Sequence, residues 1–526
     1  MIDTTRRVMM TGALAAAGVA ATGPARATPA SQLDTDVERA RTMFEVPGLS
    51  VTVVEDDRTV LAKGYGVQRL GGGRPVDAAT LFPIGSNTKA FTGAAVALLV
   101  EEGKLAWEDK VVDRLPGFRM YDDYTTREMT VVDLLVHRSG LGLGAGDLMF
   151  WPRTDFTRPE IVERLRYIRP ATSFRSGFAY DNVLYLVAGE LIAAVSGRPY
   201  EAFVAERLLG PLGMTAAIPT GSWTSAAVRT SVHARTGGAV RGLGPIRPLQ
   251  NADLGDAVSP SGGIWSSATD IARWLSTQAR TGVTPDGRRL WSEASARRMW
   301  RGETVMRASP FAGEDETQRF VLYGLGWQLE EYQGEAYVWH LGGVQGALSL
   351  TAVIPSRKVG FAILTNAEES GALRSLRNQI LDHYLGRPRR DWLPVIKAQE
   401  DEGRRQMAAQ AAEVAAIARP AKAAAPSLPL PAYVGVWRDP WYGDVVVGRK
   451  GEGLTIDFTR TPALKGALEP WDGDTFRTRF KDPAAEDAFV TFTVTDGVPT
   501  KAALKAVSPM ADFSFDYADL ALTPAG

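Results

Sequence analysis

The stretch IGSNTKAFT, residues 84–92, places a serine and a lysine three positions apart at the start of an apolar run, AFTGAAVALLV. Residues three apart on a helix share a face, so the Lys89 amine can reach the Ser86 hydroxyl. Desolvation lowers the pKa of a buried lysine toward the range in which it exchanges protons. The pattern therefore predicts that Ser86 is a nucleophile and that Lys89 helps to activate it.

A second interpretation of this stretch stays open. Ser86 can cap the helix while Lys89 extends its amine to water, and an S-x-x-K string arises by chance roughly once in a chain of this length. The serine also stands at a predicted helix N-terminus, where backbone N–H groups and the helix dipole stabilise developing negative charge. This setting favours the catalytic interpretation.

Two residues with useful chemistry, Tyr180 and Asn182, stand just before another apolar helix in FRSGFAYDNVLYLVAGELI. A tyrosine oxygen near Lys89, held partly as phenolate, can take the Ser86 proton and pass it to a leaving group. The Asn182 amide carries both a donor and an acceptor, which suits it to hold a substrate amide. Taken singly, Tyr180 is better explained as a core aromatic and Asn182 as a helix cap.

A third stretch, AYVWHLGGVQGALSL, ends a predicted strand on His340, Leu341, Gly342 and Gly343. Glycines at a strand end let a substrate backbone approach closely. The N–H of Gly343 can join the N–H of Ser86 in an oxyanion hole, where losing one donor typically costs about 3–4 kcal/mol of barrier. A tight hairpin with a surface histidine is the alternative.

In this order, the three stretches resemble the serine β-lactamase and penicillin-binding-protein superfamily, most closely its class C β-lactamase-like branch of D-aminopeptidases, DD-peptidases and esterases. The matching motifs are S-x-x-K at Ser86–Lys89, Y-x-N at Tyr180–Asn182 and K/H-x-G at His340–Gly342. The resemblance covers roughly residues 38–386. It implies substrate contacts for Asn182, His340 and Gly342.

The resemblance also implies an acyl-enzyme mechanism. Ser86 attacks a carbonyl carbon, Lys89 and Tyr180 shuttle the proton, and water later releases the acyl group. Many β-lactamases of this branch carry lysine where His340 stands, and a histidine is a weaker, pH-dependent cation. The histidine therefore favours peptides or esters over β-lactams. The frequent Pro-Gly turn before the tyrosine is replaced here by Phe174-Arg175, and Arg175 is a candidate contact for an acidic substrate.

Elements that position these residues follow from the pattern of the chain. GLSVTVVEDDRTVLAKGYGVQRL predicts two early strands, residues 86–300 are rich in helix signals, and strand signals return near 336–366. Pairing early strands with late ones predicts an α+β fold, an antiparallel sheet flanked by helices with a helical region inserted, over residues 28–386. A cleft between sheet and helices is the expected site.

The remainder of the chain differs in character. Residues 387–431 predict a charged, Ala-rich helix and a Pro/Ala linker, and residues 432–526 predict a small antiparallel β-barrel that resembles a lipocalin-like module. By that analogy the barrel caps the cleft or builds a homo-oligomer. Residues 1–27, with Arg6-Arg7, a short apolar run and Ala25-Arg26-Ala27, predict a twin-arginine-type signal peptide. An uncleaved anchor or a disordered tail is the alternative.

The composition of the chain limits the number of domains, the partners and the cofactors that can be expected. The 526 residues are too many for one ordinary core, and a net charge of −1 gives no sign of a nucleic acid partner. There is no cysteine, and the four histidines lack metal-ligand spacing, so no metal and no cofactor are expected. The glycines and Pro24 interrupt the early apolar run, so no stable membrane anchor is expected after signal removal.

Together these observations predict an exported serine hydrolase, periplasmic or secreted, whose partner is a small peptide or ester substrate. A peptidase acting on short, linear or D-residue-containing peptides is the first hypothesis. A carboxylesterase, then a β-lactamase, are the alternatives from the same chemistry. A non-hydrolytic protein that binds cell-wall peptides is the alternative of a different class.

Overall fold

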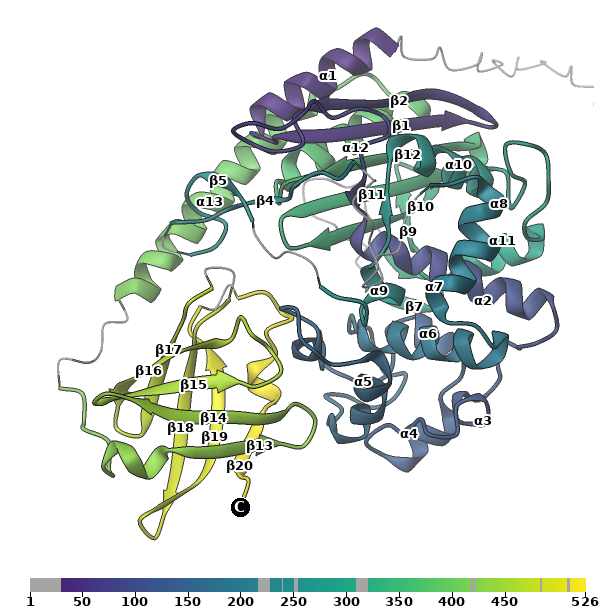
Figure 1. Cartoon of the computed structure of the whole chain (residues 1–526). Coiled ribbons are helices and arrows are strands. Elements are labelled where there is room, and N and C mark those ends of the chain that lie inside the picture. Colours follow the sequence, from purple (N-terminus) through teal and green to yellow (C-terminus); the bar gives the residue numbers. More distant parts are fainter. Residues whose placement is uncertain are drawn as a thin grey trace, which may run out of the picture.

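The computed structural model describes residues 30–215, 228–238, 240–249, 254–308, 320–416, 420, 422–482, 485–508 and 511–526. The stretch interpreted as a signal peptide, residues 1–27, lies outside the described residues. A sheet with helices on both faces, a helical region beneath it and a separate β-barrel make up the described chain (Figure 1). The predicted α+β class with a C-terminal antiparallel barrel is therefore confirmed.

The main sheet is antiparallel and joins early strands to late ones, as predicted. Val51 of an early strand faces Ile363 of a late one in the register. Three further strands, which the sequence patterns did not predict, extend the late edge of the sheet. In spatial order the strands are β2 (Arg58–Gly66), β1 (Gly48–Glu55), β12 (Val359–Thr365), β11 (Ala347–Ile354), β10 (Glu335–Val344), β9 (Gln328–Tyr332), β8 (Phe320–Tyr323) and β7 (Thr304–Ala308).

Both faces of this sheet are covered, so its central strand β12 is buried along its whole length. Phe361 and Ile363 belong to a cluster with the outer helices α1 (Ala30–Met43) and α12 (Ser370–Tyr384). Ala362 and Leu364 point the other way, into the larger core. Alternate residues thus face opposite layers, which is why the strand VGFAILT reads as a continuous apolar run.

The larger core lies between the sheet and the inserted helices. Its central helix is α2 (Thr88–Glu101), whose side chains from Thr88 to Leu99 are all buried, as its nearly uniform apolar sequence predicts. The other helices are α3 (Val111–Arg114), α4 (Asp123–Glu128), α5 (Arg158–Arg164), α6 (Val183–Ser196), α7 (Tyr200–Val204), α8 (Gly210–Leu212), α9 (Ser259–Gly262), α10 (Ala268–Ala279) and α11 (Glu293–Met299).

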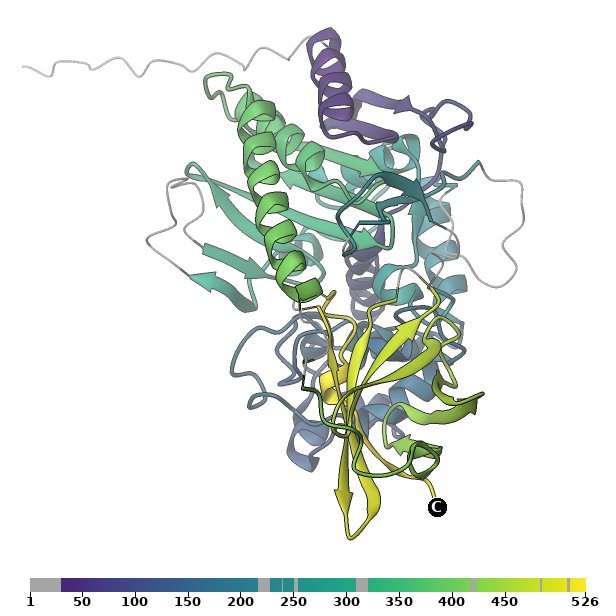
Figure 2. The ribbon, with the colours of Figure 1, turned by 90° about the vertical axis from the view of Figure 1, so that its left-hand side faces the viewer.

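A long helix, α13 (Trp392–Ala416), runs from the sheet toward the barrel (Figure 2). The barrel is closed, and its interior is filled by aromatic rings such as Tyr433, Phe476 and Phe492, whose centroids lie 4.9–5.5 Å apart. Its strands are β13 (Gly435–Asp439), β14 (Gly443–Lys450), β15 (Gly453–Phe458), β16 (Lys465–Asp472), β17 (Thr475–Phe480), β18 (Ala488–Thr495), β19 (Val498–Ala506) and β20 (Ala521–Pro524).

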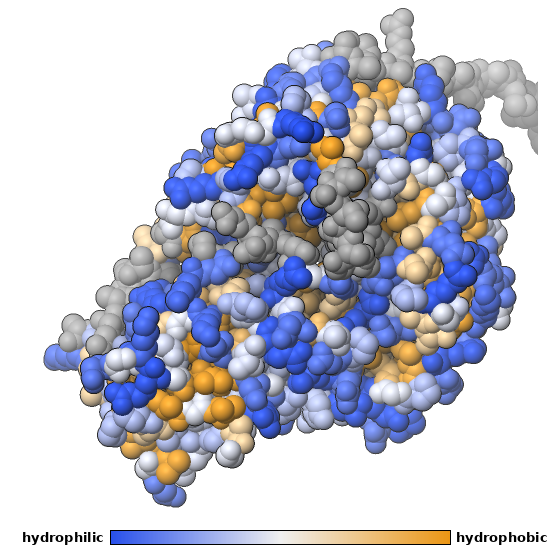
Figure 3. Space-filling view, in the orientation of Figure 1, coloured by the Kyte–Doolittle hydropathy of each residue, from blue (hydrophilic) through white to orange (hydrophobic). Residues whose placement is uncertain are grey.

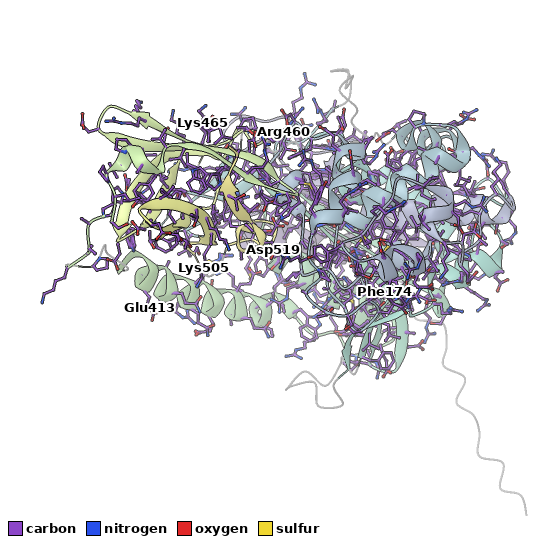
Figure 4. The ribbon with its side chains drawn as sticks, turned by 90° about the horizontal axis from the view of Figure 1, so that it is seen from below. Phe174, Glu413, Arg460, Lys465, Lys505 and Asp519 are labelled. Carbon is purple, nitrogen blue, oxygen red and sulfur yellow. The ribbon has the colours of Figure 1, made fainter. Side chains whose placement is uncertain are left out.

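The barrel packs against the inserted helical region. Arg460 of the barrel forms ion pairs with Asp155 and Glu160, the latter at 3.2 Å. Seen from below in Figure 4, Arg460 and Asp519 lie on the side of the barrel that faces the rest of the molecule. Figure 3 shows a mostly hydrophilic face with apolar side chains gathered over part of the barrel. Within the described residues, no helix is both long and apolar enough to cross a membrane.

Candidate active site

The turn that carries Ser86 is held against strand β10. Gly85 opens a short 3₁₀ helix, η1 (Gly85–Asn87), with a φ of +50°, a conformation that favours glycine. A Cβ added to Gly85 would lie 2.8 Å from the nitrogen of Gly343. Because the two backbones approach this closely, the half-buried Ser86 and the exposed Gly343 reach the same cleft.

Lys89 lies one turn into the helix, and its amine has three hydrogen-bond acceptors. Its Nζ donates to Ser86 Oγ at 3.0 Å, to Asn182 Oδ1 at 2.8 Å and to the carbonyl oxygen of Ser261 at 2.9 Å. Complete burial lowers the pKa of Lys89 to about 7, although Asp147 and Asp181 oppose the shift. The amine can therefore lose its proton near neutral pH and accept one from Ser86.

Tyr180 closes the other side of the amine. Lys89 Nζ lies 4.8 Å from the centroid of its ring, and the buried ring of His137 packs behind it at 4.2 Å between centroids. Burial raises the pKa of Tyr180 well above its ordinary value, and a hydrogen bond with Ser86 offsets only part of the shift. The phenolate expected from the sequence is therefore disfavoured at rest, and Tyr180 is a neutral proton donor.

Asn182 stands at the N-cap of α6 but makes no side-chain capping bond there. Its Oδ1 accepts from Lys89, and its Nδ2 donates to Asp147 Oδ2 at 2.9 Å. Both polar ends of the amide are thus bonded to protein, although the residue lines the cleft. In this structure the Asn182 amide orients the Lys89 amine. A substrate that contacts Asn182, as predicted, must use the same amide oxygen or nitrogen that already bonds to Lys89 or Asp147.

His340 is largely buried at the edge of the cleft, and both of its ring nitrogens are bonded to protein groups. Its Nδ1 donates to the carbonyl oxygen of Leu341 at 2.6 Å, which leaves Nε2 to accept from the Tyr323 hydroxyl at 2.9 Å. Burial and the nearby Lys89 lower the pKa of His340 to about 3. The sequence left the charge state of His340 open, and in the structure its imidazole is neutral near neutral pH.

The two glycines after His340 differ in role. Gly343 is exposed and lines the cleft, whereas Gly342 is buried and is not among the cleft-lining residues in the described part of the chain. A Cβ on Gly342 would collide with the carbonyl oxygen of Ile84 and with Ser349. The substrate contact expected for Gly342 is thus replaced by a structural role, since it lets β10 approach the Ser86 turn.

The cleft has a volume of about 570 Å³ and opens between the sheet, the inserted helices and the barrel. Ser86, Tyr180, Asn182 and Gly343 line it together with Glu486 and residues 512–515 of the barrel. Arg175, a candidate contact for an acidic substrate, donates instead to the buried carboxylate of Asp133, with Nε at 3.0 Å from Oδ1. That pair ties down the loop before Tyr180.

Buried acidic residues behind the cleft were missed in the sequence. Asp181 accepts from Ser139 Oγ at 2.6 Å and lies 3.0 Å from His137 Nδ1, and burial raises its pKa to about 8. Burial likewise raises the pKa of Asp147 to about 7. An aspartate in the Gly-rich stretch LGLGAGD is typical of a turn, so no local signal distinguishes Asp147.

The lowered pKa of Lys89 predicts a pH dependence. We expect the rate at which a fluorophosphonate labels Ser86 to rise with pH and to level off above about pH 7, because the neutral amine is the form that accepts the proton. Below that point the rate should fall about tenfold per pH unit. Labelling rates measured between about pH 5 and pH 10 check this. A rise that begins only near the ordinary lysine value of 10.5 would contradict it.

Comparisons with known proteins show the family and the fold of this chain. A family model described as "Beta-lactamase" matches residues 33–385, and one described as "Domain of unknown function (DUF3471)" matches residues 419–524. An unguisins hydrolase of Aspergillus campestris is 27% identical, over 78% of this chain and 76% of that protein. Penicillin-binding protein 4 of Amycolatopsis lactamdurans is 29% identical, over 66% of this chain and 87% of that protein. An octameric penicillin-binding protein homologue from Pyrococcus abyssi matches with a TM-score of 0.57 at 21% identity, over 94% of this chain and 100% of that chain.

Proposed function

Because the chain belongs to the β-lactamase family of serine hydrolases, we propose that it hydrolyses short, linear or D-residue-containing peptides through an acyl-enzyme on Ser86. The observation that carries the proposal is the 3.0 Å hydrogen bond between Lys89 Nζ and Ser86 Oγ at the wall of an open cleft. A lysine that only capped or stabilised a helix would have no need of complete burial beside a cleft serine.

In the proposed mechanism, neutral Lys89 accepts the Ser86 proton as Oγ attacks the carbonyl carbon of the substrate. The N–H groups of Ser86 and Gly343 stabilise the negative charge that develops on the carbonyl oxygen. Tyr180 then donates its proton to the leaving nitrogen and regains one from the Lys89 ammonium. Water attacks the acyl-enzyme in a second half-reaction and releases the acid.

Two features of the site support a peptide as substrate. An amine leaves only when protonated, and the neutral Tyr180 is held where it can supply that proton. The neutral His340 offers no cation to the carboxylate of a β-lactam, which lowers the rank of that substrate class. An ester is the second candidate, because the same acyl chemistry needs less help from an acid when an alcohol leaves.

Location and assembly belong to the proposal as well. The Arg6-Arg7 pair and the apolar run after it support export to the periplasm or beyond. Self-association through the barrel is proposed as well, and the octameric state of the penicillin-binding protein homologue from Pyrococcus abyssi supports it. Residues 28–386 are proposed as the hydrolase unit, residues 387–431 as the linker and residues 432–526 as the barrel unit.

A substrate panel tests the choice of peptide. We expect turnover of D- or L-aminoacyl anilides and of short linear peptides, because the site can protonate a leaving amine. The same full-length protein is assayed on p-nitrophenyl esters and on a chromogenic cephalosporin. Turnover confined to the esters would replace the peptidase assignment with an esterase. Labelling of Ser86 without turnover of any member would favour the non-hydrolytic peptide-binding protein.

A further inference from the structure

The barrel reaches the cleft at Glu486 and through the loop of residues 512–515, which Asp516 follows directly. Phe513 and Ser514 line the same cleft as Ser86, and the Phe513 ring lies 6.4 Å from that of Tyr180. The loop is closely packed against the hydrolase domain, since a Cβ on Gly144 would lie 2.6 Å from the Phe513 ring. The barrel thus contributes side chains to the site itself.

One of these side chains is hydrogen-bonded into the network around Lys89. Ser514 Oγ donates to Asp147 Oδ2 at 2.8 Å, and the same oxygen accepts from Asn182 Nδ2 at 2.9 Å. The other end of the Asn182 amide accepts from Lys89 at 2.8 Å. A continuous path of hydrogen bonds therefore runs from the barrel to the amine beside Ser86.

A second barrel residue fixes the loop that carries Asp147. The buried carboxylate of Asp516 accepts from the N–H of Gly146 at 2.6 Å and from the N–H of Leu148 at 3.1 Å. These two donors flank Asp147 in the chain. The barrel therefore holds the backbone on both sides of Asp147 as well as its side chain.

The charge on Asp147 matters to Lys89. Burial raises the pKa of Asp147, and the hydrogen bonds from Asn182 and Ser514 together with the Lys89 charge counter that shift. An ionised Asp147 in turn favours the ammonium form of Lys89. The other titratable groups that face this pair are Tyr180, Asp181, His137 and His340 from the hydrolase domain and Asp512 and Asp516 from the barrel.

We propose that the C-terminal barrel is part of the catalytic apparatus, with Ser514 and Asp516 as positioning residues. They hold the Asp147 carboxylate against Asn182, and Asn182 in turn orients the Lys89 amine toward Ser86. This inference rests on the proposed function of Ser86 and Lys89. It gives the barrel a role in each turnover in addition to any role in assembly.

The test compares full-length variants by the pH dependence of Ser86 labelling with a fluorophosphonate. Ser514→Ala removes the hydrogen bond to Asp147, so we expect a plateau rate about tenfold lower, because the amine is less well oriented. The rise of the profile should also move to lower pH, since Asp147 then ionises less readily and stabilises the ammonium less. Ser514→Thr keeps the hydroxyl and should restore both rate and profile.

Asp147→Asn removes the charge while keeping an acceptor for Ser514 and Asn182. We expect it to move the rise to lower pH by roughly one unit, because an opposite charge is taken from beside Lys89. A role confined to folding would change the rate without moving the profile. If Ser514→Ala does not fold, Asp516→Asn tests the barrel instead. One amide oxygen cannot replace the two carboxylate oxygens that accept from Gly146 and Leu148, so we expect a lower plateau rate.

Arg460→Ala is the matched control, because it breaks a barrel contact that is separate from the path to Lys89. It should leave both the plateau and the profile unchanged. A wild-type plateau and profile in Ser514→Ala or, where that variant does not fold, a wild-type plateau in Asp516→Asn would overturn the inference and leave the proposed function intact. Failure of the wild-type protein to label at Ser86 would refute the proposed function, and the inference with it.

Discussion

Replacing Ser86 by alanine is expected to lower turnover by roughly 10⁴-fold or more, because removing a nucleophile leaves only binding and electrostatic stabilisation. The hydroxyl is the group that Lys89 Nζ contacts at 3.0 Å and that faces the cleft. Fluorophosphonate labelling, which needs the same nucleophile, should disappear. Steady-state rates and mass spectrometry of the labelled peptide measure the two effects.

A serine outside the site is the control for this variant. Ser176 bonds to the carbonyl oxygen of Ser173 in an exposed loop, so Ser176→Ala should label and turn over as the unchanged protein does. Removal of one small hydroxyl should also leave the thermal unfolding of Ser86→Ala close to that of the unchanged protein. Equal labelling of the Ser86→Ala variant and the unchanged protein would end the assignment of the nucleophile.

Replacing Lys89 by alanine should slow acylation by at least about 100-fold, the lower end for a positioned proton acceptor. Both the proton acceptor and the orienting contact with Asn182 are lost, while Ser86 itself remains. The rate of the labelling burst isolates this step from deacylation. The rise of the profile near pH 7 should vanish together with the rate, because Lys89 is its source.

Lys89→Arg separates proton transfer from positive charge. A guanidinium keeps the charge but does not lose its proton in the accessible pH range, so we expect no rescue. Recovery of activity in Lys89→Arg would mean that the charge alone is required. Near-normal turnover in Lys89→Ala would show instead that another base operates, and Asp147 and Asp181 would be the next residues to test.

How far the site could be predicted depends on how local each signal is. Ser86 and Lys89 lie within one helical turn, so their contact follows from spacing and apolar context alone. Ser514 and Asp147 are 367 residues apart and belong to different modules, so no periodicity joins them. Their contact depends on how the barrel packs, which no short pattern contains.

Protonation states were the least predictable part. The charge state of His340 depends on Tyr323, two strands away in the sheet, and on burial by the whole domain. The charge of Tyr180 also depends on burial. A phenolate would need a lowered pKa, whereas the surroundings of Tyr180 raise its pKa. Motifs identify which side chains meet, whereas the charge that each carries follows from desolvation in the finished fold.

In the fold, too, some strands could be predicted from the sequence and others could not. Long alternating or apolar stretches, such as those of β1, β2 and β12, were predicted together with their pairing. Strands β8 and β9 were not, because runs of 4 and 5 residues carry too little pattern to stand out. They extend the sheet beside β10, and β8 supplies Tyr323 to His340.

The pairing of β1 with β12 has a consequence for biosynthesis. Leu49 is opposite Thr365 in the register, so the centre of the sheet joins residues more than 300 positions apart. At a ribosomal rate of about 5–20 residues per second, β1 waits roughly 15–60 s for its neighbour. During that interval β1 has an unpaired edge that can pair with other chains. Chaperones that cover such edges are therefore needed most before β12 has been synthesised.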